Sequence, residues 1–275
     1  MYQYSIVQWL LCFYIYCFIG WCWESAYVSV KKQQWINRGF MHGPFLPIYG
    51  SGAVMMLVAS APYQDNLALT FVSGMIGATL LELVTGILME ALFKVRYWDY
   101  SSKKFNYRGY ICLGSSLAWG VFTILMTRFV HKPIDTFLNW LPPFAALIAV
   151  LALSSYIATD FTISFIGALN LRSLLDKIDR AKEDLAVMQR RLDALVAFAD
   201  VKPEGKNGDE QPAPMQKLDE LKSAVNDAME KLRSLKNPPR RKHRGRILGN
   251  PTMVSSRYQS ALEDLKQLIK ESKRK

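Results

Sequence analysis

The sequence has few of the residues that form disulfides or bind metal ions. It contains only 4 cysteines and 3 histidines in 275 residues. The cysteines lie in apolar stretches, whereas a secreted disulfide scaffold places them in polar loops. They are Cys12, Cys17, Cys22 and Cys112. No CxxC pair occurs, so we predict neither a zinc site nor a redox centre, and no cofactor.

Motifs of catalysis and nucleotide binding are also missing. There is no G-x-x-x-x-G-K-[ST] sequence, so the chain is not expected to bind ATP through a Walker loop. His42, His131 and His243 are scattered, and neither HExxH nor GxSxG occurs. We predict no catalytic residues and no enzyme activity, so a protease or lipid transferase is the weakest reading of the chain.

The N-terminus lacks the features of a cleavable signal peptide. No basic segment precedes the first apolar stretch, and no small-x-small cleavage site follows it. That stretch is therefore expected to remain as a membrane span.

Long apolar runs dominate the first part of the chain. A helix needs about 20 apolar residues to cross a hydrocarbon core of about 30 Å. Five stretches reach or approach that length: 5–28, 44–61, 67–93, 110–130 and 142–169. The predicted fold is all-α, a polytopic membrane bundle of about five spans in residues 1–169. A cytoplasmic, coiled-coil-like helical tail follows over residues 170–275.

The second stretch is the weakest of the five. It is the shortest, and Pro47, Gly50 and Gly52 interrupt it. Such residues favour a tight loop-to-helix turn, and they also occur where discontinuous helices form substrate sites in transporters. Whether this segment crosses the bilayer or is re-entrant stays open at this level.

Basic residues in the loops predict the orientation. The loop after the first stretch carries Lys31, Lys32 and Arg38, and the loop after the third is similarly basic. The loop after the second contains no Lys or Arg, and none precedes the first. The positive-inside rule then places the N-terminus outside and the C-terminus in the cytoplasm of a multi-pass protein of the cell membrane.

Acidic residues within the apolar runs form the candidate intramembrane polar site. They are Glu24, Glu82, Glu90 and Asp160. A carboxylate near the bilayer centre costs about 3 kcal/mol on insertion scales, so such groups usually face a bundle interior or a wet cavity. Glu82 lies deep in its run, which favours a polar contact there. Glu90 is expected either in this site or at the membrane interface beside Lys94, its neighbour four residues on.

Two short signatures flank the second and third stretches. The first comprises Asn37, Arg38, Gly39, Phe40, Gly43, Pro44, Pro47, Ile48, Tyr49, Gly50, Gly52 and Ala53. The second comprises Glu82, Glu90, Trp98, Asp99, Tyr100, Ser101, Phe105, Asn106, Gly109, Ile111, Cys112, Leu113, Ser116, Trp119 and Gly120. With Gly20, Trp21 and Glu24, their order and spacing resemble the CmpB-type family of ABC-transporter type IV membrane proteins over about residues 8–168.

The resemblance implies a permease-like protein, and any ATPase would have to be a separate chain. Loops one and three are its expected docking sites. The substrate is not implied. Lys104 stands where the family pattern leads us to expect proline, so we expect that loop to be less rigid here.

The tail shows helical periodicity. Apolar residues recur at alternating steps of three and four from Leu171 to Leu195 and again from Leu218 to Leu235, as in a heptad seam. A polar linker, 202–214, separates the two seams, and a shorter amphipathic stretch ends the chain. The seams predict a helical hairpin, self-association or pairing with a partner coiled coil.

A basic segment, 236–246, lies between the tail helices. We predict that it binds anionic lipid headgroups through Arg240, Arg241, Lys242, Arg244 and Arg246. Nucleic acid would attract the same charges, but no nucleic-acid fold signature accompanies them.

Two functions fit these observations. The first is a membrane-embedded subunit of a transport system. The alternative is a membrane-anchored scaffold or cell-envelope interaction protein that acts through its tail.

Overall fold

The structure is a computed structural model that describes residues 2–199, 213–236 and 241–272. It is 79% helix and 2% strand, which confirms the predicted all-helical class. Residues 202–212 of the predicted linker and 237–240 of the basic segment lie outside the described residues.

The chain forms two compact units. The first comprises Met1–Leu169 together with Gly245–Ser256, and the second comprises Asn170–Arg244 and Arg257–Lys275. We call Gly245–Ser256 the returning segment. The sequence predicts these residues as part of the tail, whereas the structure groups them with the membrane unit.

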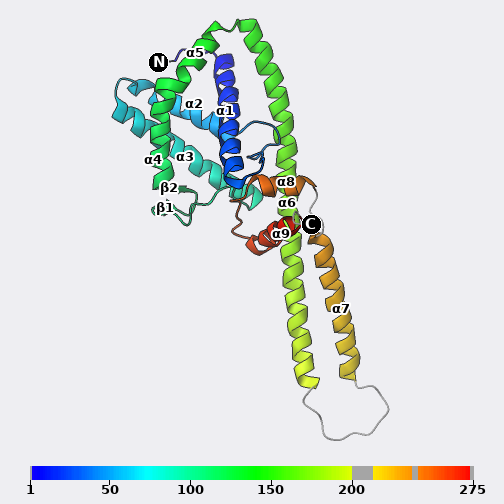
Figure 1. The fold of residues 1–275 in the computed structure, drawn as a ribbon. Coiled ribbons are helices and arrows are strands. Elements are labelled where there is room, and N and C mark those ends of the chain that lie inside the picture. Colours follow the sequence, from blue (N-terminus) through cyan, green and yellow to red (C-terminus); the bar gives the residue numbers. More distant parts are fainter. Residues whose placement is uncertain (1, 200–212, 237–240, 273–275) are drawn as a thin grey trace, which may run out of the picture. The chain divides into compact units, whose positions relative to one another are not determined.

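Six α-helices from residues 1–169 contribute to the first unit, together with the end of a later helix in the returning segment (Figure 1). They are α1 (Ile6–Lys32), α2 (Pro47–Ser60), α3 (Leu67–Phe93), α4 (Leu113–Leu125), α5 (His131–Trp140) and the first part of α6 (Pro143–Ala199). A π-helical turn, η2 (Met126–Val130), joins α4 to α5. Helix α2 packs between α1 and α3, and α3 packs against α4.

Local sequence explains where these helices begin and end. Ser5 and Gln8 form a capping box at the start of α1, and the Asn66 side chain accepts hydrogen bonds from the first turn of α3. Pro47 starts α2, since a proline at the first helical position loses no hydrogen bond. Helix α3 ends at Lys94, which has a left-handed backbone conformation.

Among the described residues, four helices are long and apolar enough to cross a membrane. They are Ile6–Lys32, Leu67–Phe93, Leu113–Trp140 and Pro143–Ala197. The protein is therefore a membrane protein, as predicted, but the count of five spans is not confirmed.

The second predicted stretch, 44–61, differs from the other four. Its helix α2 has 14 residues, or about 21 Å at 1.5 Å per residue, which is shorter than a hydrocarbon core. Residues 44–46 precede it as a non-helical approach, and a 3₁₀ turn, η1 (Ala61–Tyr63), follows it.

Side-chain contacts connect the helix ends of the first unit at both ends of the bundle, which we call its two levels. At one level, Tyr4 before α1 bonds to His131 of α5, and Arg128 of η2 donates to the Gln64 carbonyl after α2 at 2.6 Å. At the other, Arg38 after α1 pairs with Glu24 near the end of that helix. Helix α2 runs from the second level to the first.

The loop from α3 to α4 contains the only strands in the described part of the chain. They are β1 (Asn106–Tyr107) and β2 (Ile111–Cys112), an antiparallel pair in which Asn106 lies opposite Cys112. This small hairpin gives the loop a fixed shape.

The second unit consists of the rest of α6, α7 (Ala213–Lys236), the start of α8 (Arg241–Gly249) and α9 (Gln259–Glu271). Asp264 of α9 pairs with Lys182 of α6 and Lys236 of α7, each at 2.6 Å. The apolar side chains of α9 are buried. Part of the α6 seam is therefore adjacent to α9, and a two-stranded coiled coil is not confirmed.

Candidate functional site

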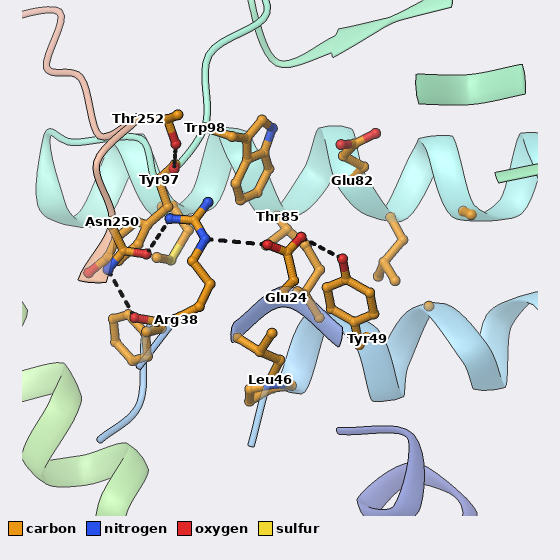
Figure 2. A pocket seen from close by; sticks show the side chains of 18 of the residues that line it. Glu24, Arg38, Leu46, Tyr49, Glu82, Thr85, Tyr97, Trp98, Asn250 and Thr252 are labelled. Carbon is orange, nitrogen blue, oxygen red and sulfur yellow. Dashed lines mark hydrogen bonds and ion pairs between the residues drawn. The ribbon is translucent and has the colours of Figure 1, made fainter. Parts of the chain in front are cut away.

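A cavity of about 510 Å³ lies within the first unit (Figure 2). Its walls come from α1 to α4, the first part of α6, the loops after α1 and α3, and the returning segment. The lining is largely apolar, with a few charged groups. This combination of size and lining is typical of small-molecule sites.

An ion pair with a tyrosine forms one wall of the cavity. Arg38 Nε lies 3.5 Å from Glu24 Oε2, and the Tyr49 hydroxyl donates to Glu24 Oε1 at 2.6 Å. Figure 2 shows the three side chains meeting in a row. The arrangement requires close contact of α1 and α2, since a Cβ at Gly20 would lie 2.3 Å from Tyr49 Cβ. The glycine of the motif thus positions the tyrosine.

Glu82 is the most buried carboxylate of the cavity, with 5% of the residue exposed. Its two oxygens accept hydrogen bonds from the Tyr100 hydroxyl and from the Trp119 indole nitrogen, each at 3.0 Å. Both donors are neutral. The Trp119 indole is a neutral donor, and burial and the Glu82 carboxylate raise the pKa of Tyr100, so its hydroxyl stays protonated. Among the described residues, no cationic side chain pairs with Glu82.

Glu90 does not line the cavity and has a different partner. Arg96 Nε lies 3.5 Å from its carboxylate, and the hydroxyls of Tyr110 and Ser256 donate to it. The expected neighbour, Lys94, follows the last residue of α3 and has a left-handed backbone conformation. Glu90 instead ties α3 to the loop and the returning segment.

The Trp98–Gly109 signature builds the loop that closes the cavity. Asp99 accepts bonds from the Ser101 backbone and hydroxyl, and the Asn106 side chain accepts from Gly109 N. Gly109 has φ +74°, and a Cβ there would lie 2.4 Å from Asp99 Oδ1. These hydrogen bonds connect residues 99–109 of the loop, in which Lys104 stands in place of the expected proline.

Asp160 holds the first signature rather than the cavity. Its carboxylate accepts from the backbone nitrogens of His42 and Gly43, at 3.2 and 2.7 Å. A Cβ at Gly43 would meet the Tyr156 hydroxyl at 2.3 Å, which explains the glycine before Pro44. His42 Nδ1 also lies 2.8 Å from Ser164 Oγ and 3.3 Å from Asp160. Because one nitrogen faces both groups, this is not a serine-nucleophile relay, which uses both ring nitrogens.

The returning segment completes the cavity wall. Arg38 Nη1 donates to Asn250 Oδ1 at 2.9 Å, and Asn250 Nδ2 donates to the Gly39 carbonyl at 3.0 Å (Figure 2). Thr252 Oγ1 donates to the Tyr97 carbonyl, and the backbones of Arg96 and Val254 exchange two hydrogen bonds. The segment is thus an integral part of the site.

Arg246 has a different environment from the predicted lipid-headgroup patch. It is 8% exposed, and its guanidinium donates to the Tyr97 hydroxyl at 3.1 Å and the Ser164 carbonyl at 2.6 Å. Its hydrogen bonds therefore serve the first unit. Arg244 is half-buried in the second unit, and Arg240 and the side chains of Arg241 and Lys242 lie outside the described residues.

Several contributors were not among the predicted site residues. Trp119 belongs to the second signature, which is the signal that could have placed it at Glu82. Asn250 and Thr252 carry no sequence signal. A separate buried group joins His131 to the hydroxyls of Tyr4 and Tyr16, both at 3.1 Å, and no motif pointed to it. No group of at least three acidic, histidine or cysteine side chains suited to a metal ion occurs in the described ranges.

Comparison with known proteins identifies the family. The family described as "Putative ABC-transporter type IV" matches residues 11–165, more than half of the chain, and the protein belongs to it. This confirms the resemblance seen in the signatures. No curated protein and no solved structure matches the chain.

Proposed function

We propose that this member of the ABC-transporter type IV family is a permease-like subunit of a transport system, and that its cavity holds the transported molecule. The observation that carries the proposal is the cavity itself. Residues of both family signatures line it, and it contains a buried carboxylate without a cationic partner among the described residues.

The same proposal includes an orientation. Helix α2 runs between the two levels of helix ends, so its direction is that of a span even though it is short. Five passes place the N-terminus outside and the basic loops inside. The cavity, near Arg38 and the loop after α3, then lies toward the cytoplasmic side.

A separate ABC ATPase would supply the energy, since the chain has no Walker loop. The loops after α1 and α3 are the proposed docking sites, and Lys103 and Lys104 are exposed there. We propose no chemical step for this chain, and the single-nitrogen geometry of His42 supports that view.

The experiment is purification of the tagged full-length protein from native membranes in a mild detergent. We expect an ATP-hydrolysing chain to co-purify. A K103E/K104E variant should recover several-fold less of it, because rim charges guide association. The matched control is K217E, an exposed lysine of α7. Absence of any ATPase, even after cross-linking in the membrane, would argue against the transport role.

A scaffold role is the second candidate. The tail helices form a compact unit of their own, with α9 held to α6 and α7 through Asp264. A folded unit of this kind offers a surface for a partner, and self-association through it remains part of this second proposal.

A further inference from the structure

One carboxylate of the cavity lacks a cationic partner among the described residues. Three carboxylates line it: Glu24, Glu82 and Asp99. Glu24 pairs with Arg38, and Asp99 lies 3.8 Å from Arg96 Nη1. Glu82 differs from both, because its partners among the described residues are all neutral, so an ionised Glu82 has no cationic partner there.

The hydrogen bonds of Glu82 favour its ionised form. Trp119 can only donate, so the oxygen that it contacts must act as an acceptor. Tyr100 donates to the other oxygen. A carboxylate that accepts from two donors is stabilised as an anion, but a buried anion also needs a cation to offset its lost hydration.

Aromatic rings supply much of the remaining wall. Phe93, Trp98, Phe161 and Phe165 line the cavity. Phe40 and Tyr97 line it as well, but both already contact the Arg246 guanidinium. Aromatic faces attract cations, especially organic cations whose substituents also need an apolar environment. A small hydrated metal ion would gain little from such a wall, whereas a bulky cation would fill it.

We propose that the cavity binds a lipophilic organic monocation of the quaternary ammonium or phosphonium type, with its charge near Glu82 and its body against the aromatic wall. The cavity volume of about 510 Å³ is within the usual range for a drug-sized ligand. The proposal rests on the proposed function only in treating this ligand as the substrate, because binding requires neither transport nor ATP.

The test compares tetraphenylphosphonium with tetraphenylborate, two ions of nearly the same size and shape but opposite charge. Binding to the purified full-length protein in nanodiscs is measured by titration calorimetry, with empty nanodiscs subtracted. We expect the phosphonium to bind about tenfold or more tightly than the borate, since a charge partner in an aromatic site is worth at least that factor.

Glu82→Gln should remove this preference, with phosphonium affinity falling about tenfold or more. Glu263→Gln, an exposed tail carboxylate, serves as the control and should leave it unchanged. Equal binding of the two ions to the wild-type protein would overturn the proposal without any variant having to fold. Unchanged phosphonium affinity in a folded E82Q protein would also overturn it, and either result would leave the ATPase experiment unaffected.

Discussion

Single glycines decide how closely α1 and α2 approach each other. A Cβ at Gly50 would lie 2.4 Å from Cys17 Sγ and 2.5 Å from the Phe13 carbonyl oxygen. The backbone carbonyl cannot move aside cheaply, so α2 would have to shift. Gly52, two residues further along, lies on the other side of α2, where the nearest atom to a Cβ is Leu81 Cδ2 at 3.9 Å.

We therefore predict that Gly50→Ala destabilises the membrane unit by about 1–3 kcal/mol, the usual cost of overpacking. Gly52→Ala should change stability by less than about 0.5 kcal/mol. The stability is measured as the midpoint temperature at which the native thiols begin to react with a thiol-reactive dye. This midpoint reports on the membrane unit alone, because the tail contains no cysteine. Equal midpoints for the two variants would contradict the packing described here.

The local sequence pattern made some of the acidic site residues predictable. An acid within an apolar run marked Glu82, and the structure places it in a buried, hydrogen-bonded position. The same reasoning grouped Asp160 with it, although Asp160 binds backbone nitrogens of the loop at 42–43. Sequence shows that a buried acid needs partners but not which partners fold toward it.

At the scale of elements, the proposed crossing of α2 can be tested from the residues on either side of it. Lys32 at the end of α1 and Asp65 after α2 are both exposed, and only α2 separates them in the helix order. In a background without native cysteines, we predict that Asp65→Cys reacts with an impermeant maleimide in intact cells. Lys32→Cys should react only after the membrane is permeabilised.

Labelling of both cysteines from the same side would show that α2 is re-entrant. The control is Lys104→Cys in the loop after α3, which should behave like Lys32→Cys if α2 crosses. With a re-entrant α2, positions 32 and 65 would share one side and position 104 would lie on the other.

The sequence predicted long elements better than short or distant ones. The stretch 67–93 coincides with α3, because its apolar run extends over the whole helix. Helix α2 is shorter than its run, since residues before Pro47 are held outside the helix. Apart from Arg246, the returning segment had no signal, because its contacts involve backbone carbonyls and single polar side chains 82–212 positions away, which leave no periodicity.

At the scale of the whole molecule, the returning segment makes the end of the chain part of the membrane unit. Deleting residues 171–275, the natural way to separate a transport role from a scaffold role, would also remove Asn250 and Thr252 from the cavity wall. Loss of a phenotype after that deletion would not reveal which role is the true one. A finer pair of truncations separates them.

A chain ending at Ser256 keeps the returning segment and loses α9, whereas a chain ending at Arg244 loses both. We predict that the first retains the thiol-exposure midpoint of the full chain. The second should lose several degrees, because the hydrogen bonds of Arg246 and Asn250 contribute roughly 1 kcal/mol each. Asn250→Ala should cause part of that loss in the full-length chain.

These truncations also decide between the two functions. If the chain ending at Ser256 keeps its midpoint and its phosphonium binding but loses its cellular phenotype, the tail is the working part and the scaffold role holds. If the phenotype survives that truncation and disappears with E82Q, the cavity is the working part. Identical midpoints for the two truncations would mean that the returning segment does not stabilise the membrane unit, which would contradict the contacts of Arg38 with Gly249 and Asn250.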